Sequence, residues 1–321
     1  MSSDRINQRS PERINKMNKK RVTALRSVEI GLPDVAAAEA FYTQTWNLSV
    51  AARQGASVYL RGTGADHHLL ALHPQEKAEL LALTFRVASA AALDELAQLA
   101  VQHGGTVLAT RAAVQEPGGG ECVVLQDPQG RILRFVWGDV RHASVAANKD
   151  RPIRLAHTVL NSHNVAEGLP FYENALGFKL SDRTRIMAFI RIPTAPHGDH
   201  HSVALADADN DCLNHIAFVM PGLESVMRGG GRMKDAGYSI EWGPGRHGPG
   251  DNTFNYFVGP AGFDIEYTAD IEQVDDSYVA RGPQDWAWPP GRVDQWGISA
   301  PPSARLKEAQ RQIGFAATCK V

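Results

Sequence analysis

The sequence predicts an α+β fold made of four βαβββ modules that pair into two tandem domains. The first observation behind this prediction is an internal repeat, in which residues 25–30 match residues 155–160. The Phe-Tyr pairs that begin at Phe41 and Phe171 show the same spacing of 130 positions. A repeat of this length defines the architecture before any local assignment. The second observation is that short apolar segments alternate with amphipathic stretches inside each copy, which indicates β-α-β units.

The first predicted domain covers residues 22–140. Its first helix is expected at 34–46, where Val35, Ala38 and Phe41 recur at helical spacing. An Ala-rich stretch predicts a second helix at 91–103. The expected strands are 22–30, 57–61, 67–73, 81–87, 106–109, 121–126 and 131–137.

The second predicted domain covers residues 153–275 and follows a linker at 141–152. It repeats the same order of elements, with helices expected at 165–176 and 223–236. The expected strands are 153–160, 187–191, 201–205, 214–220, 239–242, 253–258 and 263–268.

Two tails flank the repeat. Residues 1–21 are polar and basic without an apolar segment, so we expect a disordered tail rather than a secretory signal, and Met17 could be the natural start. Residues 276–321 form a C-terminal tail that is rich in Trp and Pro.

Three ionisable residues interrupt apolar strand segments of the second copy: His157, His215 and Glu266. Burying such groups is costly unless they are paired or bind a metal. Two His and one carboxylate form the ligand set of non-haem Fe(II) oxygenases, which leaves other positions on the metal open. The first copy has lost all three, and this asymmetry favours a ligand role over simple packing. At the corresponding positions the first copy carries Ser27, Leu83 and Arg134.

With these residues identified, the chain resembles the two-domain type I extradiol dioxygenases of the vicinal oxygen chelate superfamily over residues 22–300. Three further motifs carry the resemblance: the pair His200-His201, the Gly-Arg-His sequence ending at His247, and Tyr256. The resemblance implies a metal-free first domain and a catalytic second domain that holds the metal. It also implies that His201 is the catalytic acid–base, and that His247 and Tyr256 are catalytic residues that bind the substrate oxygens.

The activity that this resemblance implies is the insertion of both atoms of O2 into a catechol, next to its vicinal diol. Fe(II) is the expected metal, and Mn(II) is the alternative because both suit a site of two nitrogens and one oxygen. Two other functions stay open: a homoprotocatechuate-type dioxygenase for carboxylated catechols, and a glyoxalase-like isomerase or lyase on the same fold. A non-catalytic binding or resistance protein would not need Glu266.

Three residues are candidates for substrate binding: Trp242, Arg292 and His200. In homoprotocatechuate-type relatives a similar C-terminal segment covers the active site and contributes an Arg close to Arg292, so residues 276–321 are a candidate lid. The same relatives carry an Arg where this chain has Trp242, and this departure favours an alkyl-, aryl- or bicyclic catechol. His200 is expected to orient His201 or to face solvent.

The composition agrees with an intracellular enzyme for a small molecule. A net charge of −2, from 33 basic and 35 acidic residues, gives no electrostatic argument for nucleic acid or a membrane surface. No stretch approaches the roughly 18 apolar residues of a membrane span. Cys122, Cys212 and Cys319 have no paired spacing, which suits a reducing cytoplasm. The resemblance adds the expectation of a homo-oligomer.

Overall fold

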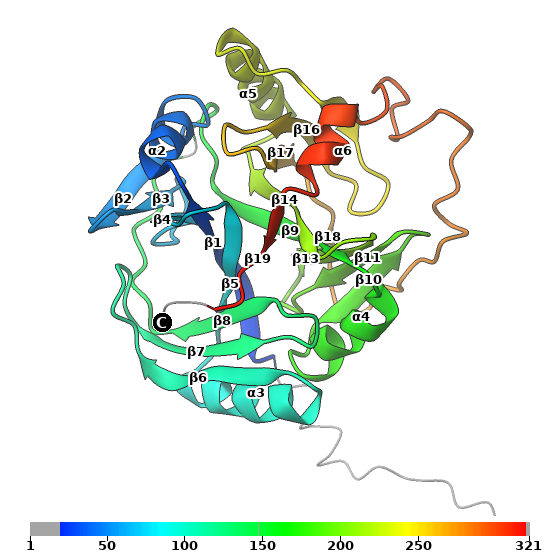
Figure 1. The fold of residues 1–321 in the computed structure, drawn as a ribbon. Coiled ribbons are helices and arrows are strands. Elements are labelled where there is room, and N and C mark those ends of the chain that lie inside the picture. The colour runs from blue at the N-terminus through cyan, green and yellow to red at the C-terminus, as the bar shows by residue number, and fades with distance from the viewer. Residues whose placement is uncertain (1–19, 147, 319–321) are drawn as a thin grey trace, which may run out of the picture.

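The computed structural model describes residues 20–146 and 148–318, so most of the predicted N-terminal tail lies outside the described residues. Strands fill the middle of the molecule and the helices lie on its outside (Figure 1). The predicted α+β class is therefore confirmed.

The first half contains two βαβββ modules, each with a helix after its first strand. The first module consists of β1 (Val22–Leu32), α2 (Val35–Gln44), β2 (Ser49–Gln54), β3 (Ser57–Arg61) and β4 (Leu70–Pro74). The second consists of β5 (Glu79–Val87), α3 (Ala90–Gln102), β6 (Thr106–Ala113), β7 (Glu121–Gln126) and β8 (Ile132–Trp137).

The second half repeats this order. Its first module consists of β9 (Arg154–Ser162), α4 (Val165–Asn174), β10 (Lys179–Arg183), β11 (Met187–Arg191) and β13 (Val203–Asp207). The next consists of β14 (Cys212–Val219), α5 (Leu223–Asp235), β15 (Trp242–Arg246), β16 (Thr253–Val258) and β17 (Asp264–Ala269). Shorter elements complete the described chain: β12 (Gly198–Asp199), β18 (Gln273–Val274), α6 (Ala304–Ala309) and β19 (Ile313–Phe315).

Strand pairing is the same in the two halves. The strands of the first half follow the order β2-β3-β4-β1-β5-β8-β7-β6, and those of the second follow β10-β11-β13-β9-β14-β17-β16-β15. The two central strands of each half are antiparallel, and each of them also pairs in parallel with the last strand of its own module. The short strand β19 pairs with both β14 and β5, so the C-terminal tail joins the two halves.

The main hydrophobic core lies between the strands and the helices and runs through both halves. Modules far apart in sequence share it, because Trp46, just after α2, stacks on Tyr267 of β17 with ring centroids 3.6 Å apart. Helices α2 and α5 accordingly lie at one end of the molecule, and α3 and α4 at the other (Figure 1). Side chains alternate along a strand, so the opposite face of each sheet is free to carry a polar site.

Two predicted details were wrong. Strands β2 and β10 were not expected, because β2 has an apolar run of only three residues and β10 is mostly polar and charged. The strand expected at 239–242 instead begins at Trp242 and continues to Arg246.

Strand register also corrects the alignment of the two copies. His215 lies opposite Val159 on β9, and at the corresponding place in the first half Ala82 lies opposite Glu29 on β1. Ala82, rather than Leu83, therefore stands where His215 stands, while Leu83 belongs to the main core. The connection between β5 and β8 is one residue longer than its counterpart, so matching by spacing alone shifted the alignment by one position.

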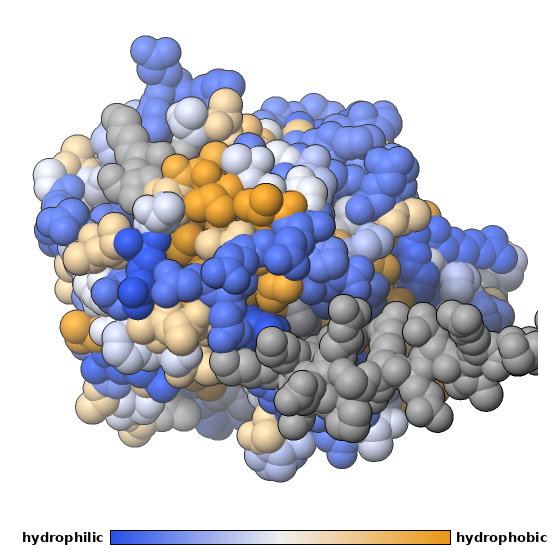
Figure 2. Space-filling view, turned by 90° about the horizontal axis from the view of Figure 1, so that it is seen from below, coloured by the Kyte–Doolittle hydropathy of each residue, from blue (hydrophilic) through white to orange (hydrophobic). Residues whose placement is uncertain are grey.

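None of the described helices is both long enough and apolar enough to cross a membrane. Seen from below, hydrophilic residues surround a main apolar area, and smaller apolar spots lie elsewhere on this face (Figure 2). Homo-oligomer formation stays a prediction, because no contact with a second copy defines an interface.

Candidate metal centre and active site

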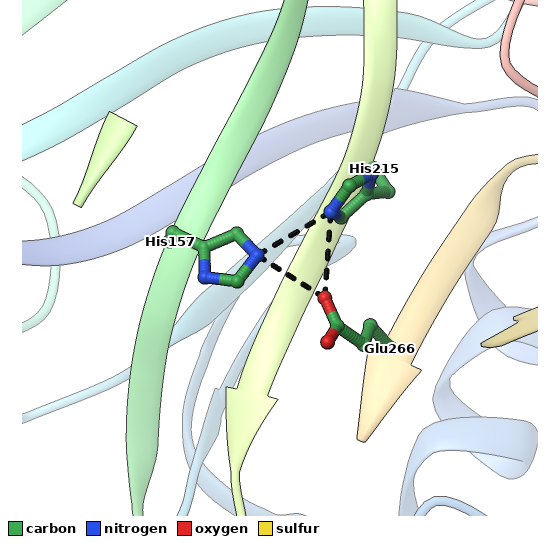
Figure 3. A group of neighbouring side chains, drawn as sticks. All are labelled: His157, His215 and Glu266. Carbon is green, nitrogen blue, oxygen red and sulfur yellow. Dashed lines mark hydrogen bonds and ion pairs between the residues drawn. The ribbon is translucent and has the colours of Figure 1, made fainter. Parts of the chain in front are cut away.

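Three neighbouring strands bring the predicted ligands together. Ala217 on β14 pairs with His157 on β9 and also with Glu266 on β17, so these two side chains flank one small residue. His215 lies two residues before Ala217, and alternate residues of a strand share one face. All three side chains therefore project from the same face of the sheet toward one point, as Figure 3 shows.

The ligand atoms are closely spaced. Nε2 of His157 lies 3.1 Å from Oε2 of Glu266, and Nε2 of His215 lies 3.4 Å from the same oxygen. The two Nε2 atoms are 3.4 Å apart. Exposed fractions of 2%, 5% and 0% for His157, His215 and Glu266 show that water does not solvate these groups freely.

This arrangement fits a first-row divalent metal. Ligand bonds of about 2.1 Å to N and O atoms place neighbouring ligands of an octahedral ion roughly 3 Å apart, close to the spacing found here. Nδ1 of His215 lies 2.8 Å from Oδ1 of Asn214, so Nδ1–H donates to this oxygen and Nε2 keeps its lone pair for a metal. Asn214 was not predicted, although its position next to a candidate ligand was visible in the sequence.

The pKa values of Glu266 and His215 favour the protonation states that bind a cation. Burial opposes ionisation of Glu266, but attraction and hydrogen bonds from His157 and His215 hold the pKa of its carboxyl well below the usual range. Burial lowers the pKa of His215 to about 4, against the opposing effect of Glu266. At neutral pH the set is thus one carboxylate with a neutral His215, as a divalent metal requires.

His201 lies beside His157, with ring centroids 4.3 Å apart. It is 2% exposed, and burial together with the neighbouring His157 and His200 lowers its pKa well below the usual value. A neutral imidazole next to the candidate metal ligands can accept a proton. His200 is fully buried behind it, and both of its ring nitrogens bond within the protein, to His201 and Asp182.

His247 and Tyr256 lie on the other side of the ligand set. Nε2 of His247 is 2.9 Å from the Tyr256 hydroxyl and 3.7 Å from Oε1 of Glu266. The Tyr256 ring meets the His215 ring edge-on at 5.1 Å. Burial and the charge of Glu266 raise the pKa of Tyr256 well above its usual value, so its hydroxyl is a hydrogen-bond donor.

Trp242 forms an aromatic wall next to this pair. Its ring stacks on Tyr256 with centroids 5.0 Å apart and meets His247 edge-on at 5.2 Å. Phe254 extends the wall, with its ring 4.5 Å from that of Trp242. The side of the site next to His247 is therefore apolar and aromatic.

The predicted lid segment lies over the loop that follows His247. The Cβ that a side chain at Gly248 would add falls 2.8 Å from the Trp288 ring and 2.9 Å from the Trp286 ring. A cavity of about 400 Å³ lies there, lined in part by Asp251, Arg281 and both Trp residues.

Arg292 lies within this C-terminal segment but is exposed. Its guanidinium donates to the backbone carbonyls of Asp294 and Gln295 and lies 5.5 Å from the Trp288 ring centre. The structure thus brings His201, His247, Tyr256 and Trp242 to the ligand set. The Arg292 side chain instead contacts backbone carbonyls of its own turn.

Comparisons with known proteins agree with this geometry. Residues 154–267, which include all three candidate ligands, match the family described as the Glyoxalase/Bleomycin resistance protein/Dioxygenase superfamily. Metapyrocatechase 2 of Cupriavidus necator is 37% identical over 174 residues, 51% of this chain and 51% of that protein. The chain therefore matches about half the length of this curated relative.

Solved structures match nearly the whole fold. The Mn(II)-bound glyoxalase from Novosphingobium aromaticivorans is 32% identical, with a TM-score of 0.83 over 89% of this chain and 94% of that chain. Homoprotocatechuate 2,3-dioxygenase from Arthrobacter globiformis is 22% identical, with a TM-score of 0.81 over 93% and 94%, a likeness of fold alone.

Fold and site together define a protein of paired βαβββ modules with a buried candidate metal site in its second half. The chain belongs to the glyoxalase/bleomycin resistance protein/dioxygenase superfamily, and the predicted vicinal oxygen chelate fold is confirmed. His157, His215 and Glu266 lie close enough together to hold a metal ion.

Proposed function

We propose that this protein is an Fe(II)-dependent extradiol dioxygenase that cleaves an apolar-substituted or bicyclic catechol beside its vicinal diol. The observation that carries the proposal is that side chains able to donate or accept protons lie on both sides of the ligand set. His201 stands on one side, and the hydrogen-bonded pair of His247 and Tyr256 stands on the other. The name of the metapyrocatechase relative supports the same reaction class.

The metal would be held by His157, His215 and Glu266, with Mn(II) as the alternative to Fe(II). When bound, a divalent metal supplies Lewis acidity that favours loss of protons from a catechol, and open positions for both reactants. Two neutral His and one carboxylate leave a net charge of about +1 at the centre, which favours a catecholate over the neutral diol.

The protein groups would divide the proton chemistry between them. Tyr256 and His247 would hydrogen-bond the oxygen of the bound diol on their side, since their polar atoms lie 2.9 Å apart and act as one unit. His201 would take the proton of the other hydroxyl and return it as the O–O bond breaks. The ring bond next to the diol is cleaved, O2 accepts the electrons that the ring loses, and both oxygen atoms stay in the product.

The substrate substituent is assigned from the aromatic wall and the charges around it. Trp242, which is backed by the buried Phe254, offers apolar contact. Two arginines already pair with carboxylates, Arg246 with Asp251 at 2.7 Å and Arg281 with Asp182 at 3.1 Å. A carboxylated substrate would have to displace such a partner, so an uncharged substituent fits better.

A glyoxalase-like isomerase is the second candidate, because a 32% identical structure carries that name. Such a reaction needs a carboxylate base on the open side of the metal. Asp264 is the extra carboxylate that approaches the set, 4.0 Å from Nδ1 of His215, but it lies behind that ring. Burial raises the pKa of its carboxyl well above the usual value, and the Gln310 side chain donates to its Oδ2, so it is not aimed at the ligand set. These observations favour the dioxygenase.

Oxygen consumption tests the proposal. Anaerobically purified, Fe(II)-loaded protein is mixed with catechol, 3- and 4-alkylcatechols, 2,3-dihydroxybiphenyl, 1,2-dihydroxynaphthalene and homoprotocatechuate. We expect stoichiometric O2 uptake with a yellow ring-opened product, and the highest kcat/KM for an uncharged substituent. Absence of uptake with metal bound would reject the dioxygenase, and a preference for homoprotocatechuate would reject the apolar substrate. Cytoplasmic location and homo-oligomer formation remain predictions alongside it.

A further inference from the structure

The hydrogen bonds of His201 continue away from the candidate metal centre through two fully buried residues. Nδ1 of His201 lies 3.1 Å from Nδ1 of His200, and Nε2 of His200 lies 3.0 Å from Oδ2 of Asp182. Both His200 and Asp182 are 0% exposed. Among the described residues, Nε2 of His201 has no hydrogen-bond partner.

Asp182 is held as a hydrogen-bond acceptor by several donors. The backbone N–H of Arg281 donates to its Oδ1 at 2.9 Å, and the Tyr278 hydroxyl donates to the same oxygen at 3.2 Å. The Arg281 guanidinium lies 3.1 Å from Oδ2. Burial opposes ionisation, but His200 and Arg281 together hold the pKa of the Asp182 carboxyl below its usual value. The group that faces His200 is therefore a carboxylate.

This chain of bonds decides which nitrogen of each ring carries a proton. A carboxylate has no proton to donate, so Nε2–H of His200 is the donor to Asp182. In the Nε2–H tautomer of His200, Nδ1 is an acceptor, and Nδ1–H of His201 donates to it. Nε2 of His201 is left with a lone pair.

We propose that Asp182 and His200 are positioning residues that hold His201 in its Nδ1–H tautomer, with the Nε2 lone pair free to accept a substrate proton. This inference rests on the proposed function and extends it. Proton transfer to Nε2 turns the His201 ring into an imidazolium. Its positive charge is connected through the hydrogen bonds of His200 to the negative Asp182 carboxylate. The ring is also fixed sterically, since a Cβ on Gly250 would fall 3.0 Å from Cε1 of His201 and the Phe189 ring lies 5.1 Å away.

The first half of the chain contains the same His-His contact without a carboxylate beside it. Nδ1 of His67 lies 2.9 Å from Nδ1 of His68, as in the second half. Strand register places Ala52 at the position of Asp182, because each follows the same irregularity in its strand. Nη1 of Arg26 lies 2.8 Å from Nε2 of His68, so this nitrogen is already engaged. The carboxylate occurs in the half that carries the candidate metal ligands.

The Asp182→Asn substitution should reverse the direction of the hydrogen bonds that run from His201 through His200 to residue 182. The amide oxygen stays on the backbone N–H of Arg281, so the amide NH2 faces His200 and requires Nε2 there to accept. His201 then carries its proton on Nε2 and loses its free lone pair. We expect kcat to fall by about 10²-fold or more, with metal content kept and a smaller change in KM. The same exchange in serine-protease triads lowers kcat about 10⁴-fold through the wrong tautomer.

The His tautomer can be read without any activity. Two-dimensional ¹⁵N NMR of full-length, ¹⁵N-His-labelled protein loaded with diamagnetic Zn(II) separates protonated from unprotonated ring nitrogens. The His201 signals are assigned by their loss in His201→Gln. We expect Nδ1–H in the wild type and Nε2–H in Asp182→Asn. The matched control is His67→Gln, which alters the His pair of the other half and should change neither the His201 signals nor kcat.

Two results would overturn the inference: a His201 that carries its proton on Nε2 in the wild type, or an unchanged tautomer in Asp182→Asn. Failure of the proposed function looks different, because the wild type would then cleave none of the catechols while the NMR result still decides the role of Asp182.

Discussion

The two halves of this chain share one topology but bury different ionisable groups at corresponding positions of their sheets. In the second half a row of paired residues crosses the sheet from Trp242 through Tyr256, Glu266 and Ala217 to His157. The corresponding row of the first half consists of Ala109, Val124, Arg134, Thr84 and Ser27. A buried carboxylate that faces two His in one half is replaced by a guanidinium in the other.

The first half neutralises its buried charges internally. The Arg134 guanidinium pairs with Glu29 and lies 2.8 Å from Glu116, while Thr84 donates to Glu29 at 3.0 Å. The second half leaves its carboxylate between the imidazoles of His157 and His215, an arrangement that can hold a metal ion. The two halves share one sheet, and a few exchanges along one row separate a candidate metal site from a set of buried ion pairs.

The largest expected effect comes from Glu266→Ala, which removes the carboxylate of the second half. Metal affinity should fall by more than about 100-fold, because even a lost partner behind a ligand costs 10- to 100-fold. Ring cleavage should fall to background. Metal content after desalting and O2 uptake measure the two effects. Retention of metal would place the site elsewhere.

Arg134→Met makes the complementary change in the first half. Glu29 would lose its guanidinium partner while it stays buried, so the free energy of unfolding should fall by about 3–5 kcal/mol. Urea-induced unfolding measures this, and metal content should stay at the wild-type level. The double variant Glu29→Met and Arg134→Met should recover most of the loss. A loss of metal in Arg134→Met would show that the first half takes part in the site.

His201→Phe should lower kcat by about 10²-fold, as expected when an acid–base group is lost, with metal content unchanged. His68→Phe is the matched exchange in the first half. It should keep wild-type kcat while the free energy of unfolding falls by about 1–3 kcal/mol, because the Arg26 guanidinium loses its buried acceptor. Steady-state kinetics and urea unfolding separate the two. Equal kcat in the two variants would remove His201 from the reaction.

The smallest effect concerns the aromatic wall. Trp242→Arg should lower kcat/KM for alkyl- and arylcatechols by about 10-fold, the size expected for a changed apolar contact, and raise it for homoprotocatechuate. Competition between the two substrates measures the ratio directly. An unchanged ratio would remove Trp242 from the substrate contact.

The sequence was sufficient for features that repeat or alternate. The 130-residue repeat gave the topology, and ionisable residues in apolar strands gave His157, His215 and Glu266. It was not sufficient where the signal is a single residue. Asp182 lies on β10, a strand with too few apolar residues to be recognised.

The register of the strands could not be predicted from the sequence either. A shift of one residue moves a side chain to the other face of a strand, and spacing alone could not show that Ala82 rather than Leu83 matches His215. The direction of Arg292 depends on carbonyl groups in its own turn, which no pattern of residue types reveals.

The most direct test of the central difference between the halves is anomalous diffraction at the iron edge from crystals of Fe(II)-loaded protein. We expect a single peak for each chain, within about 2.0–2.2 Å of Nε2 of His157, Nε2 of His215 and a carboxylate oxygen of Glu266. A peak between Arg134 and Glu29, or no peak in protein that cleaves catechols, would contradict the account.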